Sequence, residues 1–149
     1  AAGASAVVVT TNGTWQGMSG LPETDENSSL EPRMRFGMGS ISKRFLGALI
    51  MRLAEEGRLA LDDPLSRWLP EFPHVTNAGT IRQFLAHTRG IYNSTELPDF
   101  LPAMTAANRF HEPRDTLGFL RSFYFRPGAG YHCSNSGFIL SGRVAEAAG

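Results

Sequence analysis

The first twenty residues carry the hydrophobic pattern of a β-hairpin. Residues 4–10 are rich in valine, Asn12-Gly13 is a strong type I′ turn signal, and residues 14–18 can return beside the first strand. A lone hairpin is only marginally stable in water. We therefore expect these two strands to belong to a larger sheet than residues 1–20 supply.

The most regular helical pattern begins at Ser40 and ends at Gly57. Apolar residues recur there at four-residue intervals with others beside them, which is the spacing that gathers side chains on one face of a helix. The wide apolar face comprises Ile41, Phe45, Leu46, Leu49, Ile50 and Leu53.

Shorter helical patterns follow in the rest of the chain. Asp63 and Pro64 predict a helix start, with Asp63 as the N-cap, and its expected buried side is Leu65, Trp68 and Leu69. Thr80 is expected to cap the next helix, which ends near residues 87–90.

The second half of the chain is less regular. Residues 91–112 have no clear period and contain two prolines, so we expect a loop or lid with at most short helical turns. The pattern is amphipathic again at residues 113–123, and residues 137–148 predict a last helix that ends at Gly149.

Composition excludes several classes of function. The formal net charge is zero with 14 Lys+Arg and 14 Asp+Glu, which argues against a nucleic-acid partner. Cys133 is the single cysteine, so the chain has no internal disulfide and no multi-cysteine metal site. The four histidines lack metal-ligand spacing, and no apolar stretch approaches the ~20 residues of a membrane span. Nothing implies a cofactor.

Ser40 and Lys43 form the first candidate catalytic pair. Residues three apart at the head of a helix lie on one face, so the lysine can reach the serine hydroxyl. A hydroxyl becomes a good nucleophile when a neighbour removes its proton, and a lysine can do so when it is neutral. Lys43 is also the only lysine in the chain. Taken alone, the four-residue pattern is common, and a solvated Lys43 in the first turn is the competing interpretation.

Residues 127–135 are the second candidate segment, a tight turn that leads small polar side chains toward a helix start. Asn135 could donate to a substrate carbonyl or bond Lys43, and we expect Ser134 to lie with it on the substrate side. Cys133 or Tyr131 could carry a proton. The competing interpretation makes Asn135 an N-cap and Tyr131 a core residue. His87, at a helix end, is expected to be a structural hydrogen-bonding residue.

These segments together resemble the serine β-lactamase and penicillin-binding-protein superfamily, in the branch of class C β-lactamases, D-alanyl-D-alanine carboxypeptidases and related esterases. The matching segments are residues 36–43, 55–70, 80–90 and 127–135, in family order. The resemblance implies an α+β fold, an antiparallel sheet flanked by helices, of which this chain is the mostly helical part with an N-terminal β-hairpin. It also implies frequent export from the cell, by analogy alone.

The resemblance assigns roles to individual residues. Ser40 would be the acylated nucleophile, Lys43 its proton partner and Asn135 the amide of the second motif, which binds the substrate. The tyrosine of that motif is replaced by Cys133, whose thiol can titrate but is shorter than a phenol. No metal is implied.

The family's third motif, Lys-Thr-Gly or His-x-Gly on a later strand, is absent from the chain. We therefore expect residues 1–149 to be an incomplete domain, with the hairpin at 1–20 and the nucleophile helix and helical region at 36–149. A complementary chain or segment would complete the sheet.

The expected function is a serine acyl hydrolase or transferase that works through an acyl-enzyme on a small-molecule or peptide substrate. Lactams, D-amino-acid peptides and esters stay open as substrates. The first alternative is a non-catalytic relative that binds a ligand, motivated by Cys133, and the second is an unfolded truncation product, motivated by unpaired strand edges.

Overall fold

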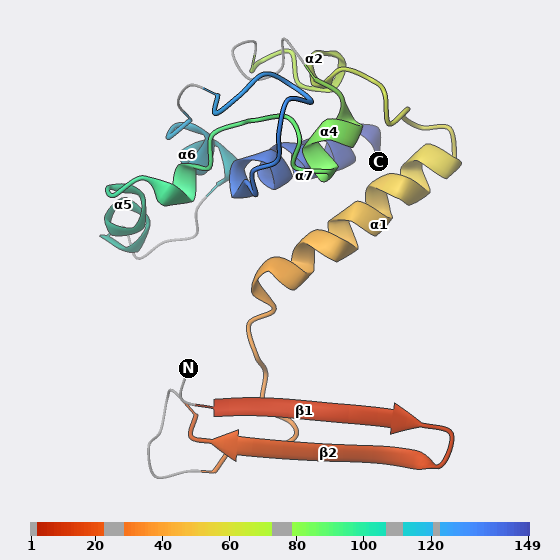
Figure 1. Ribbon diagram of the computed structural model, residues 1–149, viewed down its shortest axis with the longest axis vertical. Helices are drawn as coiled ribbons and strands as arrows, with labels where there is room; N and C mark the ends of the chain where they lie inside the picture. The colour runs from red at the N-terminus through yellow and green to blue at the C-terminus, as the bar shows by residue number, and fades with distance from the viewer. Residues whose placement is uncertain (1–2, 23–28, 73–78, 107–111, 121–122) are drawn as a thin grey trace. The chain divides into compact units, whose positions relative to one another are not determined.

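The computed structural model describes residues 3–22, 29–72, 79–106, 112–120 and 123–149. The chain forms two compact units, residues 1–39 and 40–149. The first contains strands β1 (Gly3–Thr10) and β2 (Gly13–Gly20), paired antiparallel along their whole length (Figure 1). The predicted hairpin is confirmed.

The turn of this hairpin differs from the prediction. A type I′ turn needs positive φ at both central residues, and Asn12 does not have it. The paired end residues are Thr10 and Gly13, so Thr11 and Asn12 form the turn. The Thr10 hydroxyl accepts the Asn12 N–H at 3.3 Å and donates to the Gly13 carbonyl at 3.1 Å. This side chain stabilises a turn that starts one residue earlier.

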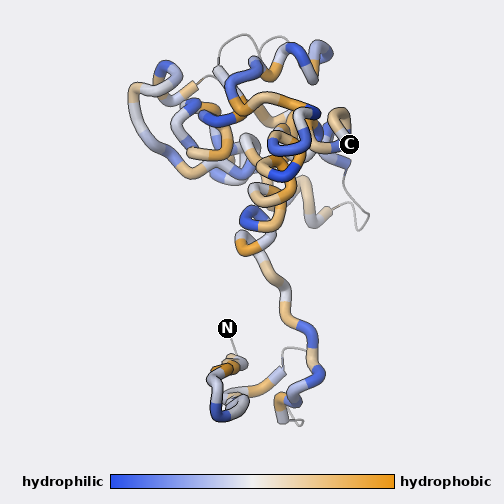
Figure 2. The backbone as a smooth tube through the Cα atoms, turned by 90° about the vertical axis from the view of Figure 1, so that its right-hand side faces the viewer, coloured by the Kyte–Doolittle hydropathy of each residue, from blue (hydrophilic) through white to orange (hydrophobic). Residues whose placement is uncertain are grey.

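The second unit is built around helix α7 (Asn135–Ala148), drawn in dark blue in Figure 1. Helices α1 (Ser42–Glu55), α2 (Leu65–Trp68), α4 (Ile81–Leu85) and α6 (Pro113–Leu117) and the 3-10 turn η2 (Ser94–Glu96) all contact it. Figure 2 colours the hydrophobic residues of the chain orange. Among the described residues the buried core comprises Ile50, Leu53, Leu59, Leu65, Leu69, Ile81, Phe84, Ile91, Leu117, Leu140, Val144, Ala145 and Ala148.

Helix α1 begins two residues later than predicted, because residues Gly39–Ile41 form a separate 3-10 turn, η1. Its inner side is buried at Ile50 and Leu53. The outer residues of the predicted apolar face are exposed, with Phe45 at 64% and Leu49 at 49%. The other elements of the second unit therefore cover only part of the apolar face of α1.

The starts of α2 and α4 show two kinds of capping. Thr80 caps α4 as predicted, and Gln83 completes a capping box. Asp63 does not cap α2, whose N-cap is Pro64. The Asp63 carboxylate instead accepts from the Ala60 N–H at 2.9 Å, from Arg67 at 2.8 Å and from Trp68 at 3.2 Å.

Three other boundaries depart from the sequence pattern. Residues 91–112 contain a seven-residue helix, α5 (Phe100–Ala106), where only short turns were predicted. Pro102 lies in its first turn, where proline is tolerated. Helix α6 ends at Leu117 instead of Phe123, and α7 starts two residues before the predicted Gly137.

Candidate active site

The Ser40 hydroxyl and the Lys43 amine meet at the start of α1. Ser40 lies in η1, and Lys43 is the second residue of α1, so the three-residue spacing puts them on one side of the chain. Lys43 Nζ is 2.7 Å from Ser40 Oγ. Gly39, with φ of 51°, turns the backbone into η1 in a conformation that other residues adopt at a cost. The predicted pair is therefore in direct hydrogen-bond contact.

Asn135 approaches the same lysine from the far end of the sequence. Its Oδ1 accepts a hydrogen bond from Lys43 Nζ at 2.6 Å, across 92 residues of chain. Phe138, one turn along α7, places its ring centre 5.9 Å from the same nitrogen. The first turns of α1 and α7 thus meet here, and the positive ends of both helix dipoles favour negative charge beside Ser40.

Asn135 is available for Lys43 because Ser134 caps α7 in its place. The Ser134 hydroxyl accepts the Gly137 N–H and donates to the Tyr92 carbonyl, both at 3.3 Å, and Ser134 is 1% exposed. A buried hydroxyl used in this way does not face a substrate, which departs from the expectation for Ser134. The competing interpretation also does not hold, since Asn135 is not the N-cap and Tyr131 is 68% exposed.

The other end of the Asn135 side chain is bound by residues that the sequence analysis missed. Asn135 Nδ2 donates to Thr95 Oγ1 at 2.9 Å, and that hydroxyl donates to Asn93 Oδ1 at 3.0 Å. Asn93 Oδ1 also accepts the backbone N–H of Asn135 at 3.0 Å. These residues lie in a segment without hydrophobic period, and the run of polar residues at 93–96 was the only available signal.

Glu96 anchors this polar segment. Its carboxylate accepts from Asn93 Nδ2 at 3.0 Å and from the Tyr124 hydroxyl. The bond from Tyr124, and then that from Asn93, lower the pKa of Glu96. Burial, reinforced by Glu96, raises the pKa of Tyr124 to about 12, so its hydroxyl remains a donor. The ring of Tyr124 stacks on His132 with centres 3.9 Å apart.

Cys133 lies beside His87. It is exposed, and its Sγ lies 3.8 Å from His87 Nε2. His87 bonds the backbone on its other side, where Nδ1 accepts the Ser134 N–H at 3.1 Å. The expectation that His87 is a hydrogen-bonding residue is confirmed, and the Cys133 thiol lies beside its ring.

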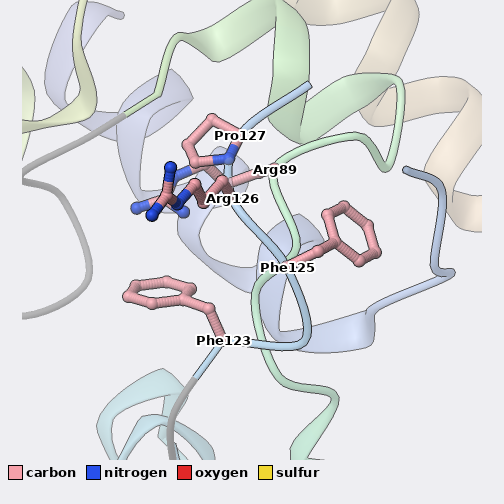
Figure 3. A pocket seen from close by; sticks show the side chains of 5 residues that line it. All are labelled: Arg89, Phe123, Phe125, Arg126 and Pro127. Atoms are coloured by element: carbon pink, nitrogen blue, oxygen red, sulfur yellow. The ribbon is translucent and has the colours of Figure 1, made fainter. Parts of the chain in front are cut away.

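A separate pocket of about 380 Å³ is lined by Arg89, Phe123, Phe125, Arg126 and Pro127. Figure 3 shows the Arg89 guanidinium on the same side as the Phe123 ring, with Phe125 pointing away, and the guanidinium carbon lies 4.2 Å from the centre of the Phe123 ring. Neither Ser40 nor Lys43 nor Asn135 lines this pocket.

The described residues hold no group of three side chains that could bind a metal ion. Two of the four histidines, His74 and His111, lie outside these residues. Within the same described ranges, no helix is long and apolar enough to cross a membrane.

Comparison with known proteins finds a family and several similar proteins. The Beta-lactamase family model matches residues 1–149. "Penicillin-binding protein 4*" of Bacillus subtilis is 33% identical over 136 residues, which is 87% of this chain and 28% of that protein.

Two solved structures are similar in sequence and in fold. The D-stereospecific amidohydrolase from a Streptomyces species is 32% identical, with a TM-score of 0.81 over 99% of this chain and 44% of its own. The penicillin binding protein from Bacillus halodurans is 29% identical, with a TM-score of 0.73. The match covers 98% of this chain and 45% of that one. The expected α+β fold of the β-lactamase and penicillin-binding-protein type is therefore confirmed. The chain spans under a third of the curated relative and under half of each solved chain, and it belongs to the beta-lactamase family.

Proposed function

We propose that the protein is a serine acyl hydrolase or transferase in which Ser40 is the nucleophile. One observation carries the proposal: Lys43 Nζ lies 2.7 Å from Ser40 Oγ and 2.6 Å from Asn135 Oδ1. A nucleophile, its base and an orienting group within hydrogen-bond reach form the arrangement that activated hydroxyls require.

Lys43 is the base in the proposed reaction. Its lone pair accepts the Ser40 proton while Ser40 Oγ bonds to the carbonyl carbon of an amide, lactam or ester. The bond to the leaving nitrogen or oxygen then breaks, the leaving atom receives the proton, and an ester on Ser40 remains. Water, or another nucleophile, attacks this ester and releases Ser40 with its proton restored.

Asn135 orients Lys43 and contributes to substrate binding. Its Oδ1 is occupied by Lys43, and Nδ2 donates one of its two hydrogens to Thr95. The second hydrogen is the group that can bond a substrate carbonyl. Ser134 has no such role in this proposal, because its hydroxyl is buried.

Cys133 is proposed to replace the family tyrosine as an impaired proton carrier. Its thiol faces His87 Nε2 at 3.8 Å, so a proton could pass between this pair and the leaving group. The contact of Cys133 with His87 also favours a second candidate function, a ligand-binding protein without catalytic activity. In that case the side chain at position 133 contacts His87 and carries no proton in a reaction.

The substrate class is proposed from the similar proteins together with the site. One solved relative is described as a D-stereospecific amidohydrolase and another as a penicillin binding protein, and the curated relative is named Penicillin-binding protein 4*. An amide or lactam carbonyl is therefore the first substrate to test, with simple esters second.

Intact-mass spectrometry after incubation with a penicillin, and separately with a fluorophosphonate, tests the proposal. We expect an adduct of one equivalent that is lost in Ser40→Ala. An adduct that persists in Ser40→Ala would contradict the role of Ser40. Folded protein without any adduct would favour the ligand-binding alternative.

We also propose that a complementary segment packs on this chain and completes its sheet. Apolar residues of η1 and of the outer side of α1 are exposed, including Ile41, Phe45 and Leu49, and the described strands form a sheet of β1 and β2 alone. Hydrogen exchange of the β1 and β2 amides tests this. Exchange at the outer edges as fast as in an isolated hairpin peptide would count against it.

A further inference from the structure

A directional chain of hydrogen bonds leads from Lys43 away from the nucleophile. Lys43 Nζ donates to Asn135 Oδ1 at 2.6 Å, Asn135 Nδ2 donates to Thr95 Oγ1 at 2.9 Å, and Thr95 Oγ1 donates to Asn93 Oδ1 at 3.0 Å. A threonine hydroxyl has a single proton. Because that proton goes to Asn93, the Thr95 oxygen offers a lone pair to the Asn135 amide.

The direction of these bonds determines which end of the Asn135 amide faces Lys43. In the reversed orientation, the amide NH₂ would point at the lysine amine and the amide oxygen would point at a hydroxyl oxygen whose proton is already used. Both contacts of the observed orientation would be lost. The Thr95 hydroxyl therefore selects the orientation in which Oδ1 accepts from Lys43.

Thr95 is itself held in place from both sides. Its acceptor Asn93 is 8% exposed and also accepts the Asn135 backbone N–H at 3.0 Å. Asn93 Nδ2 donates to Glu96 at 3.0 Å, which keeps the Asn93 oxygen turned toward Thr95. Thr95 is exposed, so its hydroxyl can be removed without opening the core.

We infer that Thr95 is a positioning residue: its hydroxyl orients the Asn135 amide, and the amide holds the Lys43 amine against Ser40. This inference rests on the proposed function, because its consequence is a faster reaction of Ser40. Thr95 acts through Asn135 and does not need to touch the substrate.

The test compares three substitutions. Thr95→Val keeps the shape and removes the hydroxyl, whereas Thr95→Ser keeps the hydroxyl. Thr105→Val is the matched control, since Thr105 is exposed in α5 and its hydroxyl donates to the Leu101 carbonyl at 2.9 Å. The rate of Ser40 labelling at saturating fluorophosphonate is measured by intact mass.

We expect Thr95→Val to slow labelling on the order of tenfold, the effect of one lost hydrogen bond, with Thr95→Ser within about twofold of the unchanged protein. Thr105→Val leaves the rate unchanged. Labelling of Thr95→Val at the original rate overturns the inference. Equal slowing in Thr95→Val and Thr95→Ser also overturns it, because the hydroxyl would then not be the cause.

A second measurement does not depend on activity. The side-chain NH₂ signal of Asn135 in a ¹⁵N spectrum, assigned by its loss in Asn135→Asp, reports its hydrogen bond through hydrogen exchange. We expect exchange to accelerate in Thr95→Val and to stay slow in Thr95→Ser. Unchanged exchange in Thr95→Val overturns the inference, whereas failure of Ser40 to label in the unchanged protein contradicts the proposed function.

Discussion

His87 Nδ1 accepts the backbone N–H of Ser134, with 3.1 Å between the two nitrogens. Because this N–H is a donor, Nδ1 carries no proton and the neutral ring is protonated at Nε2, which faces Cys133 Sγ at 3.8 Å. His87 also has φ of 59° at the end of α4, where glycine is usual. The fold tolerates this backbone strain because the ring joins α4 to the segment before α7.

Replacing the His87 ring should destabilise the fold unless the acceptor is retained. We expect His87→Ala to lower the free energy of unfolding by roughly 1–3 kcal/mol, because the Ser134 N–H loses its partner. His87→Asn should lower it less, since asparagine tolerates positive φ and its Oδ1 can accept from Ser134. Urea unfolding measures both. Equal stability of His87→Ala and the unchanged protein would contradict this role.

Acid should destabilise the protein through the same ring. Burial, then the positive charges of Lys43 and His132, lower the pKa of His87 below its ordinary 6.5. As the pH falls below about 6.5, His87 binds a proton in the unfolded protein but not yet in the folded one. The free energy of unfolding therefore decreases until the pH reaches the pKa of His87 in the folded protein. The free energy of unfolding is measured between pH 8 and 5. A pH slope that is the same in His87→Asn would show that another group causes it.

Glu96 should contribute stability at neutral pH and lose it in acid. Its pKa lies below the ordinary 4.5, so its contribution is complete above that value and disappears as pH falls through the lowered pKa. We expect Glu96→Gln to lower the melting temperature at pH 7 by roughly 2–4 °C. The difference from the unchanged protein should shrink below pH 4. A difference that is constant with pH would exclude the charge as its origin.

A tyrosine at position 133 should restore the missing phenol if the protein is an impaired enzyme. Cys133 is exposed, so a larger side chain can be accommodated. We expect Cys133→Tyr to raise the rate of Ser40 acylation by roughly tenfold or more, the lower part of the range for general acid–base catalysis. Cys133→Phe supplies the ring without the hydroxyl. Equal rates in these two variants would favour the ligand-binding alternative.

The glycines in η1 and in the middle of α1 should respond in opposite ways to alanine. Gly39 has φ of 51°, where a Cβ costs roughly 1–2 kcal/mol, so Gly39→Ala should destabilise η1 and slow Ser40 labelling. Gly47 lies within the helix, and an added Cβ meets nothing within 4 Å. Gly47→Ala should therefore stabilise by about 0.5–1 kcal/mol. Thermal unfolding and the labelling rate measure both, and a stabilising Gly39→Ala would contradict the strain argument.

Several expectations failed where a single side chain outweighed the local pattern. The Thr10 hydroxyl stabilises a hairpin turn one residue earlier than predicted. The Ser134 hydroxyl caps α7, which starts two residues earlier than predicted. Pro102 suggested a loop, yet it lies in the first turn of α5, where a missing N–H costs nothing. The position of each turn or helix end depends on which of two similar hydrogen-bond arrangements the fold can accommodate. The spacing of hydrophobic residues does not predict which arrangement forms.

The sequence by itself determined the features that depend on near neighbours. The presence of the hairpin, the Thr80 N-cap and the contact between Ser40 and Lys43 all arise within a few residues, so periodicity and spacing were sufficient to predict them. Tertiary structure decided the partners of Lys43 and Asn135. Packing of α1, η2 and α4 on α7 brings Asn135 to Lys43 across 92 residues and sets Thr95 and His87 beside the second motif. These contacts join segments far apart in the chain, and only burial of a shared core places their polar side chains together.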